Sequence, residues 1–95
     1  MSFIKPITIY ERGEIKVYIN QCHSGGRKTK VFAVRRNDKT GRSALLGLIV
    51  FDPGWRQYVL LPEKDTKWCG SCMNEISKFT INQTNKWKKM RVTPS

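Results

Sequence analysis

The sequence predicts an α+β fold, in which four to five short strands form an antiparallel curved sheet and one C-terminal helix packs on one face of it. Apolar and polar side chains alternate in several short segments before residue 62, which is the period of a strand. From residue 69 onward the apolar side chains recur at helical spacing. The connections between the predicted strands are short, which favours antiparallel pairing. We expect one domain over residues 1–95, with strands within about 3–61, a helix over about 71–88 and a basic tail over 86–95.

The first part of the chain predicts a hairpin. Residues 3–10 are largely apolar, but Pro6 restricts them to an edge or irregular strand. Residues 11–14 predict a tight turn, because Gly13 can adopt a positive φ. Residues 15–20 then alternate strictly, so that one face of the second strand is aliphatic and the other is basic and aromatic.

Two further strands are predicted in the middle of the chain. Residues 31–36 lie between a polar loop at 21–30 and a polar turn at 37–43. Residues 44–51, ALLGLIVF, are apolar on both faces, which is typical of a central strand.

The last predicted strand covers residues 55–61 and follows an Asp52-Pro53-Gly54 turn, which Asp52 can cap and in which Gly54 supplies the permissive position. Alternation places Trp55 with Val59 and Leu61, which we expect to face the core. Arg56 and Tyr58 would then share the other face. Pro62 ends the strand, because proline cannot donate to the ladder.

The predicted helix over 71–88 has Ser71 as its best N-cap. Positions 72, 76, 79, 83 and 87 share one face, and Gln83 is its polar member. Four cations lie within 86–91, and cations near a helix C-terminus offset the helix dipole. One amphipathic helix therefore covers one sheet face and leaves the other face for solvent or a partner.

The charge of the chain indicates the class of that partner. Eighteen Lys and Arg against seven Asp and Glu give a net charge of +11, which favours an anionic partner. Nucleic acid is the usual choice, and an anionic membrane surface is the next. No apolar run approaches membrane-spanning length, so we expect no membrane partner.

Single-stranded nucleic acid is held by cations that contact phosphates and by aromatic rings on which bases stack. The sequence provides both residue types on its predicted strands and on the loop at 21–30. The expected sheet contacts are Lys16, Tyr18, Arg35, Arg36, Arg56 and Tyr58, and the expected loop contacts are Arg27, Lys28 and Lys30.

Cys69-Gly70-Ser71-Cys72 matches a C-x-x-C pattern, which has three interpretations. A redox pair would open a helix inside a βαβ unit, but no strand follows the predicted helix. A zinc site would need two more ligands, for which Cys22 and His23 are the only remaining Cys and His. We favour the third interpretation, with Cys72 a small buried helix residue, Cys69 incidental and no metal bound.

No arrangement of residues predicts an enzyme. His23 is the only histidine, the carboxylates are few and scattered, and Gly25-Gly26-Arg27-Lys28 lacks the spacing of a phosphate loop. We therefore expect no catalytic residues and no cofactor. The odd number of cysteines and the lack of a signal-peptide pattern at the N-terminus favour a reducing, cytoplasmic setting.

Part of the second half of the chain resembles a class of small phage-borne proteins. The matching residues are Trp55-Arg56-Gln57-Tyr58, the apolar pair at 60 and 61, Pro62-Glu63, Thr66, Trp68, Cys72, Glu75-Ile76 and Phe79. Met73 stands where that class has Leu, and Cys69 is additional. The resemblance implies a phage source, and thus the cytoplasm of a host cell, more than it implies an activity.

The predicted order of strands and helix is also similar to the fold of the single-stranded-DNA-binding transcriptional coactivator and the Whirly proteins. Proteins of that fold are dimers or higher oligomers that bind single strands on the sheet. We thus expect a homodimer that binds single-stranded DNA with low sequence preference, as an accessory to phage replication, transcription or recombination. The alternative is a phage-encoded modulator that binds an acidic host or phage protein.

Overall fold

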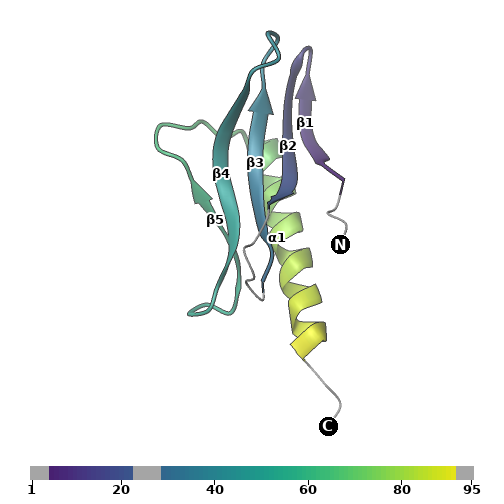
Figure 1. Ribbon diagram of the computed structural model, residues 1–95, viewed down its shortest axis with the longest axis vertical. Helices are drawn as coiled ribbons and strands as arrows, with labels where there is room; N and C mark the ends of the chain where they lie inside the picture. Colours follow the sequence, from purple (N-terminus) through teal and green to yellow (C-terminus); the bar gives the residue numbers. More distant parts are fainter. Residues whose placement is uncertain (1–4, 23–28, 92–95) are drawn as a thin grey trace.

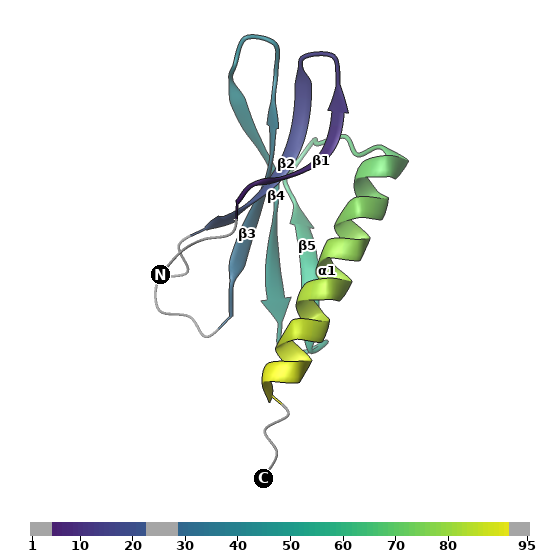
Figure 2. The same cartoon turned by 90° about the vertical axis from the view of Figure 1, so that its right-hand side faces the viewer.

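Over residues 5–22 and 29–91, the computed structural model contains one five-stranded antiparallel sheet and one helix (Figure 1). The strands pair in chain order, which confirms the predicted α+β fold. The helix, α1, crosses one face of the sheet, and the β1–β2 and β3–β4 hairpins project beyond its first turn (Figure 2). The elements are β1 (Ile7–Arg12), β2 (Ile15–Cys22), β3 (Val31–Asn37), β4 (Ser43–Asp52), β5 (Gln57–Pro62) and α1 (Gly70–Arg91).

The two hairpin turns follow from their residue types. Gly13 has a φ of 61° and opens the two-residue loop between the paired Arg12 and Ile15, as in a type II′ turn. In the β3–β4 loop, the Asp38 carboxylate accepts the backbone N–H of Thr40 at 2.9 Å and that of Arg42 at 3.0 Å. These hydrogen bonds lower the pKa of Asp38, the largest contribution coming from the Thr40 hydroxyl. Asp38, the one acidic residue among the cations of this region, therefore stabilises the turn.

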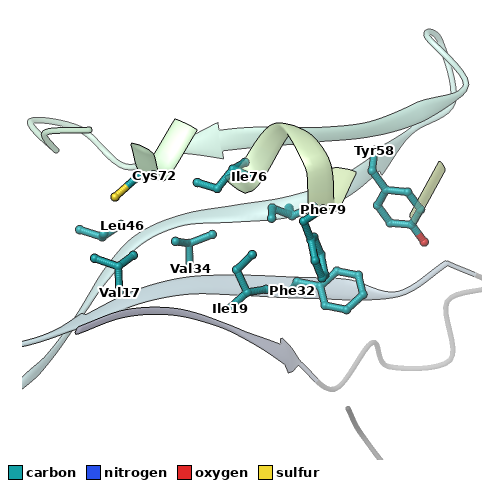
Figure 3. Close-up of a cluster of buried hydrophobic side chains, with 10 residues drawn as sticks. Val17, Ile19, Phe32, Val34, Leu46, Tyr58, Cys72, Ile76 and Phe79 are labelled. Carbon is teal, nitrogen blue, oxygen red and sulfur yellow. The ribbon is translucent and has the colours of Figure 1, made fainter. Parts of the chain in front are cut away.

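The hydrophobic core lies between the sheet and α1 (Figure 3). Ile19, Phe32 and Ile49 are fully buried in the sheet, as the alternation of β2 and the apolar run of β4 predict. Phe79 of α1 packs edge-on against Phe32, with ring centroids 4.9 Å apart. The predicted helix face is confirmed, because Cys72, Ile76, Phe79 and Gln83 are buried and Trp87 packs against the core.

The helix begins one residue before the predicted N-cap, so the assignment of Ser71 as the cap is wrong. Cys69 occupies the cap position, and its Sγ accepts the backbone N–H of Cys72 at 3.3 Å. The Cys69 carbonyl accepts the N–H of Met73 at 3.0 Å. No helix in the described part of the chain is long and apolar enough to cross a membrane.

The edge strand β5 is covered by α1. The backbone N–H of Tyr58 donates to Thr84 Oγ1 at 2.9 Å, so a helix side chain pairs a donor that would otherwise lack a partner at the sheet edge. Gly47 of β4 lies opposite Pro62, where a Cβ would be 2.8 Å from the Leu61 carbonyl oxygen. The close approach of β4 and β5 therefore requires glycine at position 47.

Candidate nucleic-acid interface

The sheet face that points away from α1, called the outer face below, carries part of the predicted interface. Its residues follow from the strand register, because directly paired residues share a face and successive residues alternate. Tyr18 of β2 pairs with Arg35 of β3, and Lys16 lies two residues from Tyr18. The structure thus brings Lys16, Tyr18 and Arg35 together: alternation predicts that Lys16 and Tyr18 share a face, and the register adds Arg35. The outer face comprises Thr8, Glu11, Lys16, Tyr18, Asn20, Ala33, Arg35, Asn37, Ser43, Leu45, Leu48, Val50, Asp52, Gln57, Val59 and Leu61.

Tyr18 leans across the sheet instead of standing upright from it. Its hydroxyl donates to Asn37 Oδ1 of β3 at 3.3 Å and lies 3.2 Å from Ser43 Oγ of β4. Because neighbouring strands are about 4.8 Å apart, a side chain from β2 reaches β4 only by lying over β3. The half-buried ring therefore lies over β3 and is partly exposed to solvent.

Two cations flank this ring. Lys16 forms an ion pair with Glu11 at 3.6 Å, and both side chains are about half exposed. Such a surface pair contributes at most about 1 kcal/mol, so a phosphate can compete for the ammonium group. Arg35 is half-buried and has no carboxylate within ion-pair distance in the described part of the chain.

Arg36 does not share this face. It pairs with the buried Val17, so it lies on the side of the sheet that carries α1. The expectation that Arg35 and Arg36 form one set of sheet contacts is wrong, because successive strand residues point to opposite faces.

Tyr58 is a core residue, which corrects the expectation that its ring is available on the sheet surface. Only 7% of it is exposed, and its ring packs edge-on against Phe32 and Phe51 at centroid distances of 6.2 and 5.6 Å. Its hydroxyl accepts the backbone N–H of Lys30 at 3.3 Å. Burial raises the pKa of the phenol, as expected for a group enclosed by apolar side chains.

Trp55 was expected to face the core, but it is 72% exposed, so that expectation is wrong. The turn after β4 is longer than predicted, and Asp52 Oδ1 accepts the N–H groups of Gly54 at 2.8 Å and Trp55 at 3.3 Å. The positive φ falls on Arg56, at 55°, and not on Gly54. Trp55 and Arg56 therefore lie in the β4–β5 turn and β5 begins at Gln57, so neither residue is a sheet-face contact.

A second group of cations lies at the end of the molecule where α1 ends. The start of β3, the β4–β5 turn and the last turns of α1 meet there, as both ribbon views show (Figures 1 and 2). These segments bring Lys30, Arg56, Lys86, Lys88 and Lys89 to the same end, all of them exposed. The expected contacts Arg27 and Lys28 lie outside the described residues. In the sequence, two features could have indicated this group of cations: the basic tail and Trp55, which strand alternation assigned to the core.

The cysteines do not assemble around a metal in the described part of the chain, which contains no group of three or more Cys, His, Asp or Glu placed to hold one. Cys69 and Cys72 lie beside Val17. Cys22 is five residues further along β2, roughly 16 Å away at the rise of a strand. His23 lies outside the described residues.

The structure defines a small α+β protein in which a five-stranded meander is covered on one face by a single helix. Comparison of the chain with protein-family models, with curated proteins and with solved structures gives no match. The resemblances to phage-borne proteins and to the Whirly fold therefore stay predictions.

Proposed function

We propose that this protein binds single-stranded nucleic acid, most specifically single-stranded DNA, with low sequence preference and through the outer face of its sheet. The observation that carries the proposal is the Tyr18 ring, laid over β3 by its hydrogen bonds to Asn37 and Ser43 and flanked by Lys16 and Arg35. A partly exposed ring between two cations is the arrangement that binds a base and its flanking phosphates.

The chemistry of this surface also supports low sequence preference. Stacking accepts any base, since every base has a π-face, and phosphate contacts carry no sequence information. Neither interaction requires a paired duplex, and stacking on a protein ring requires bases that are free of their neighbours. The surface therefore favours single strands over double strands.

The path of a longer strand follows from the position of Trp55. From Leu45, which pairs with Arg35, β4 continues seven residues to Asp52, or about 23 Å at the rise of a strand. Trp55 is exposed in the turn just beyond, beside Arg56. A strand that begins on Tyr18 and runs over β2 and β3 in the same direction would meet a second aromatic ring and a second group of cations at the far end of the sheet.

The test compares single- and double-stranded oligonucleotides of equal length in titrations at several salt concentrations. We expect tighter binding of the single strand. Tyr18→Ala should weaken that binding by about 1–3 kcal/mol with little change in salt dependence, because it removes a stack and no charge. Tyr18→Phe is the matched control: it keeps the ring but loses the hydrogen bonds to Asn37 and Ser43 that position it, so it should bind less tightly than the unchanged protein and more tightly than Tyr18→Ala.

Two results would refute the proposal. One is equal affinity for single and double strands, which indicates generic attraction between a polycation and phosphate. The other is a Tyr18→Ala variant that binds single strands as the unchanged protein does. Either result would favour the alternative, a modulator that binds an acidic protein, for which the +11 charge also provides complementarity.

A further inference from the structure

Two thiols lie together at the start of α1, on the opposite side of the sheet from the outer face. Cys69 is exposed, Cys72 is 5% exposed, and their sulfur atoms are 3.0 Å apart. A disulfide bond is about 2.05 Å long, so the two sulfurs need to approach by only about 1 Å to form one. From the sequence we interpreted Cys69 as incidental, whereas the structure places its sulfur within reach of Cys72.

The surroundings make the two thiols chemically unequal. The hydrogen bond between the two sulfurs lowers the pKa of Cys69, and the backbone N–H of Cys72 adds to this effect. Burial is the largest cause that raises the pKa of Cys72, to about 11. Once Cys69 is ionised, its sulfur can only accept from Cys72. The exposed Cys69 sulfur is therefore the nucleophile, and the buried Cys72 stays protonated until Cys69 has reacted.

An open groove with a volume of about 650 Å³ lies beside this pair, and both cysteines line it. Its apolar wall includes Ile15, Val17, Leu46 and Trp68. Among the described residues that line it, Arg36 and Lys67 are the cations and Asp65 is the only acid. The groove can therefore hold a small peptide-sized molecule beside Cys69, with a preference for negative charge.

We propose that Cys69 and Cys72 form a dithiol–disulfide pair that exchanges with small peptide disulfides bearing carboxylates, bound in this groove. The proposal does not depend on the nucleic-acid function. Exchange needs an accessible thiol, a second thiol in reach and room for the disulfide, and these are provided by the exposed Cys69, by the Cys72 sulfur 3.0 Å away and by the groove. The absence of a βαβ unit, which argued against a redox pair at the level of sequence, bears on the fold around such a pair and not on these three requirements.

The reaction proceeds in two balanced exchanges. The Cys69 thiolate attacks one sulfur of the external disulfide, whose S–S bond breaks as its other half leaves as a thiolate and takes a proton from water. Cys72 then loses its proton to solvent and attacks Cys69 Sγ, which releases the second half. One external disulfide is reduced to two thiols, and the protein gains one disulfide by losing two hydrogens.

The test uses reduced full-length protein and oxidised glutathione as the probe, with samples quenched by acid and mapped by peptide mass spectrometry. We expect a Cys69–Cys72 disulfide in the unchanged protein and a stable glutathione adduct on Cys69 in Cys72→Ser. Cys69→Ser should leave Cys72 unmodified, and serine at this position keeps a side-chain acceptor for the helix cap. Cys22 is the internal reference thiol in every sample.

A second readout needs no substitution at either cysteine. Alkylation of Cys69 in the unchanged protein, followed against pH, should have a midpoint below 9.0, the ordinary pKa of a cysteine. The proposal is overturned if that midpoint is at or above this ordinary value. It is equally overturned if Cys69 and Cys72 remain thiols while Cys22 reacts, or if Cys72 reacts as readily in Cys69→Ser.

The expected charge of the substrate has its own matched pair of variants. Lys67→Ala removes a cation from the groove, whereas Lys86→Ala removes one from α1 about 25 Å away at the rise of a helix. Lys67→Ala should slow the reaction with oxidised glutathione by about two- to tenfold more than Lys86→Ala does. With cystamine, a cationic disulfide, the order should reverse, because Lys67→Ala removes a repelling charge from the groove. Equal effects of both variants on the glutathione reaction would refute the anionic substrate class.

Discussion

Single side chains decide where several elements begin. The Cys69 sulfur caps α1, and the Asp52 carboxylate orders the turn that precedes β5. In both cases a short polar side chain pairs backbone N–H groups that have no partner in the regular element. Cys69 therefore caps α1 in addition to its proposed chemistry. A substitution at position 69 changes the helix cap as well as the thiol.

At Cys72, the raised pKa predicts that stability depends on pH. The folded protein holds the Cys72 proton up to about pH 11, whereas an unfolded thiol loses it near the ordinary value of 9.0. This contribution to stability is fully present below pH 9 and is lost as the pH rises towards 11. We expect the free energy of unfolding of the reduced protein, measured with denaturant, to fall over this range.

The control for this prediction is Cys72→Ala, in which the fall should be smaller. Tyr58 adds a loss of the same sign at higher pH, because burial raises its pKa above 10.0, and it does so in both proteins. An equal fall in the unchanged protein and in Cys72→Ala would show that Cys72 does not contribute.

Contacts between elements depend on two positions of β4 and α1. The first is Thr84, whose hydroxyl accepts the N–H of Tyr58 from the edge strand β5. Thr84→Val keeps the shape and leaves that buried donor without a partner, which should cost about 1–3 kcal/mol of unfolding free energy. Thr80→Val is the matched control, because the Thr80 hydroxyl bonds only to the Ser77 carbonyl of its own helix. Equal losses in the two variants would show that the contact between α1 and β5 contributes nothing specific.

The second position is Gly47, where β4 and β5 approach closely. An alanine Cβ would lie 2.8 Å from the Leu61 carbonyl oxygen and 3.1 Å from Pro62 Cα, both backbone atoms that cannot move alone. Gly47→Ala should therefore destabilise the fold by about 1–3 kcal/mol in denaturant unfolding. Gly70→Ala is the control, since its Cβ would meet nothing within 4 Å, and it should not destabilise. A neutral Gly47→Ala would contradict the close approach seen here.

The sequence predicted the elements well and their ends less well. Alternation located β2 and the buried Val17 and Ile19, and helical spacing located the buried face of α1. The two faces of β5 were assigned the wrong way round. Trp55 was taken as a core residue of the strand, whereas it lies in the turn. Turn length depends on which N–H groups Asp52 accepts, and the pattern of apolar residues carries no information about that.

The candidate interface was also predicted only in part, because alternation shows which residues of one strand share a face but not how two strands pair. Lys16 and Tyr18 share a face by simple alternation, and this needs no knowledge of partner strands. That Arg35 joins them and Arg36 does not depends on the register between β2 and β3, which only the structure provides. The proximity of the Cys69 and Cys72 sulfurs likewise depends on where α1 begins.

For the molecule as a whole, the outer face divides into a polar and an apolar half. Lys16, Tyr18 and Arg35 lie on β2 and β3, whereas β4 and β5 present an apolar surface of Leu48, Val50, Val59 and Leu61, of which Leu61 is 52% exposed, with Asp52 at its end. Because no Lys or Arg of the described strands lies in this apolar half, two copies with a charge of +11 each can approach through it. A second copy is therefore the occupant we predict there, in a C2 pairing.

The dimer prediction is tested by light scattering over a range of concentrations. We expect twice the chain mass of 11.0 kDa, and Leu61→Lys should return the mass to that of one chain. Ile81→Lys is the control, because Ile81 is similarly exposed but lies on α1, and it should remain a dimer. A single-chain mass at every concentration would reject the dimer.

The most direct test of the outer face as a nucleic-acid interface compares Arg35→Ala with Arg36→Ala. The two variants remove the same charge from adjacent residues, but from opposite faces of the sheet. The measurement is the dependence of single-stranded DNA affinity on salt concentration, in which each neutralised phosphate contributes a slope of roughly −0.7. We predict that Arg35→Ala flattens the slope by about that amount and that Arg36→Ala changes it much less. Equal slopes for the two variants would contradict binding through the outer face.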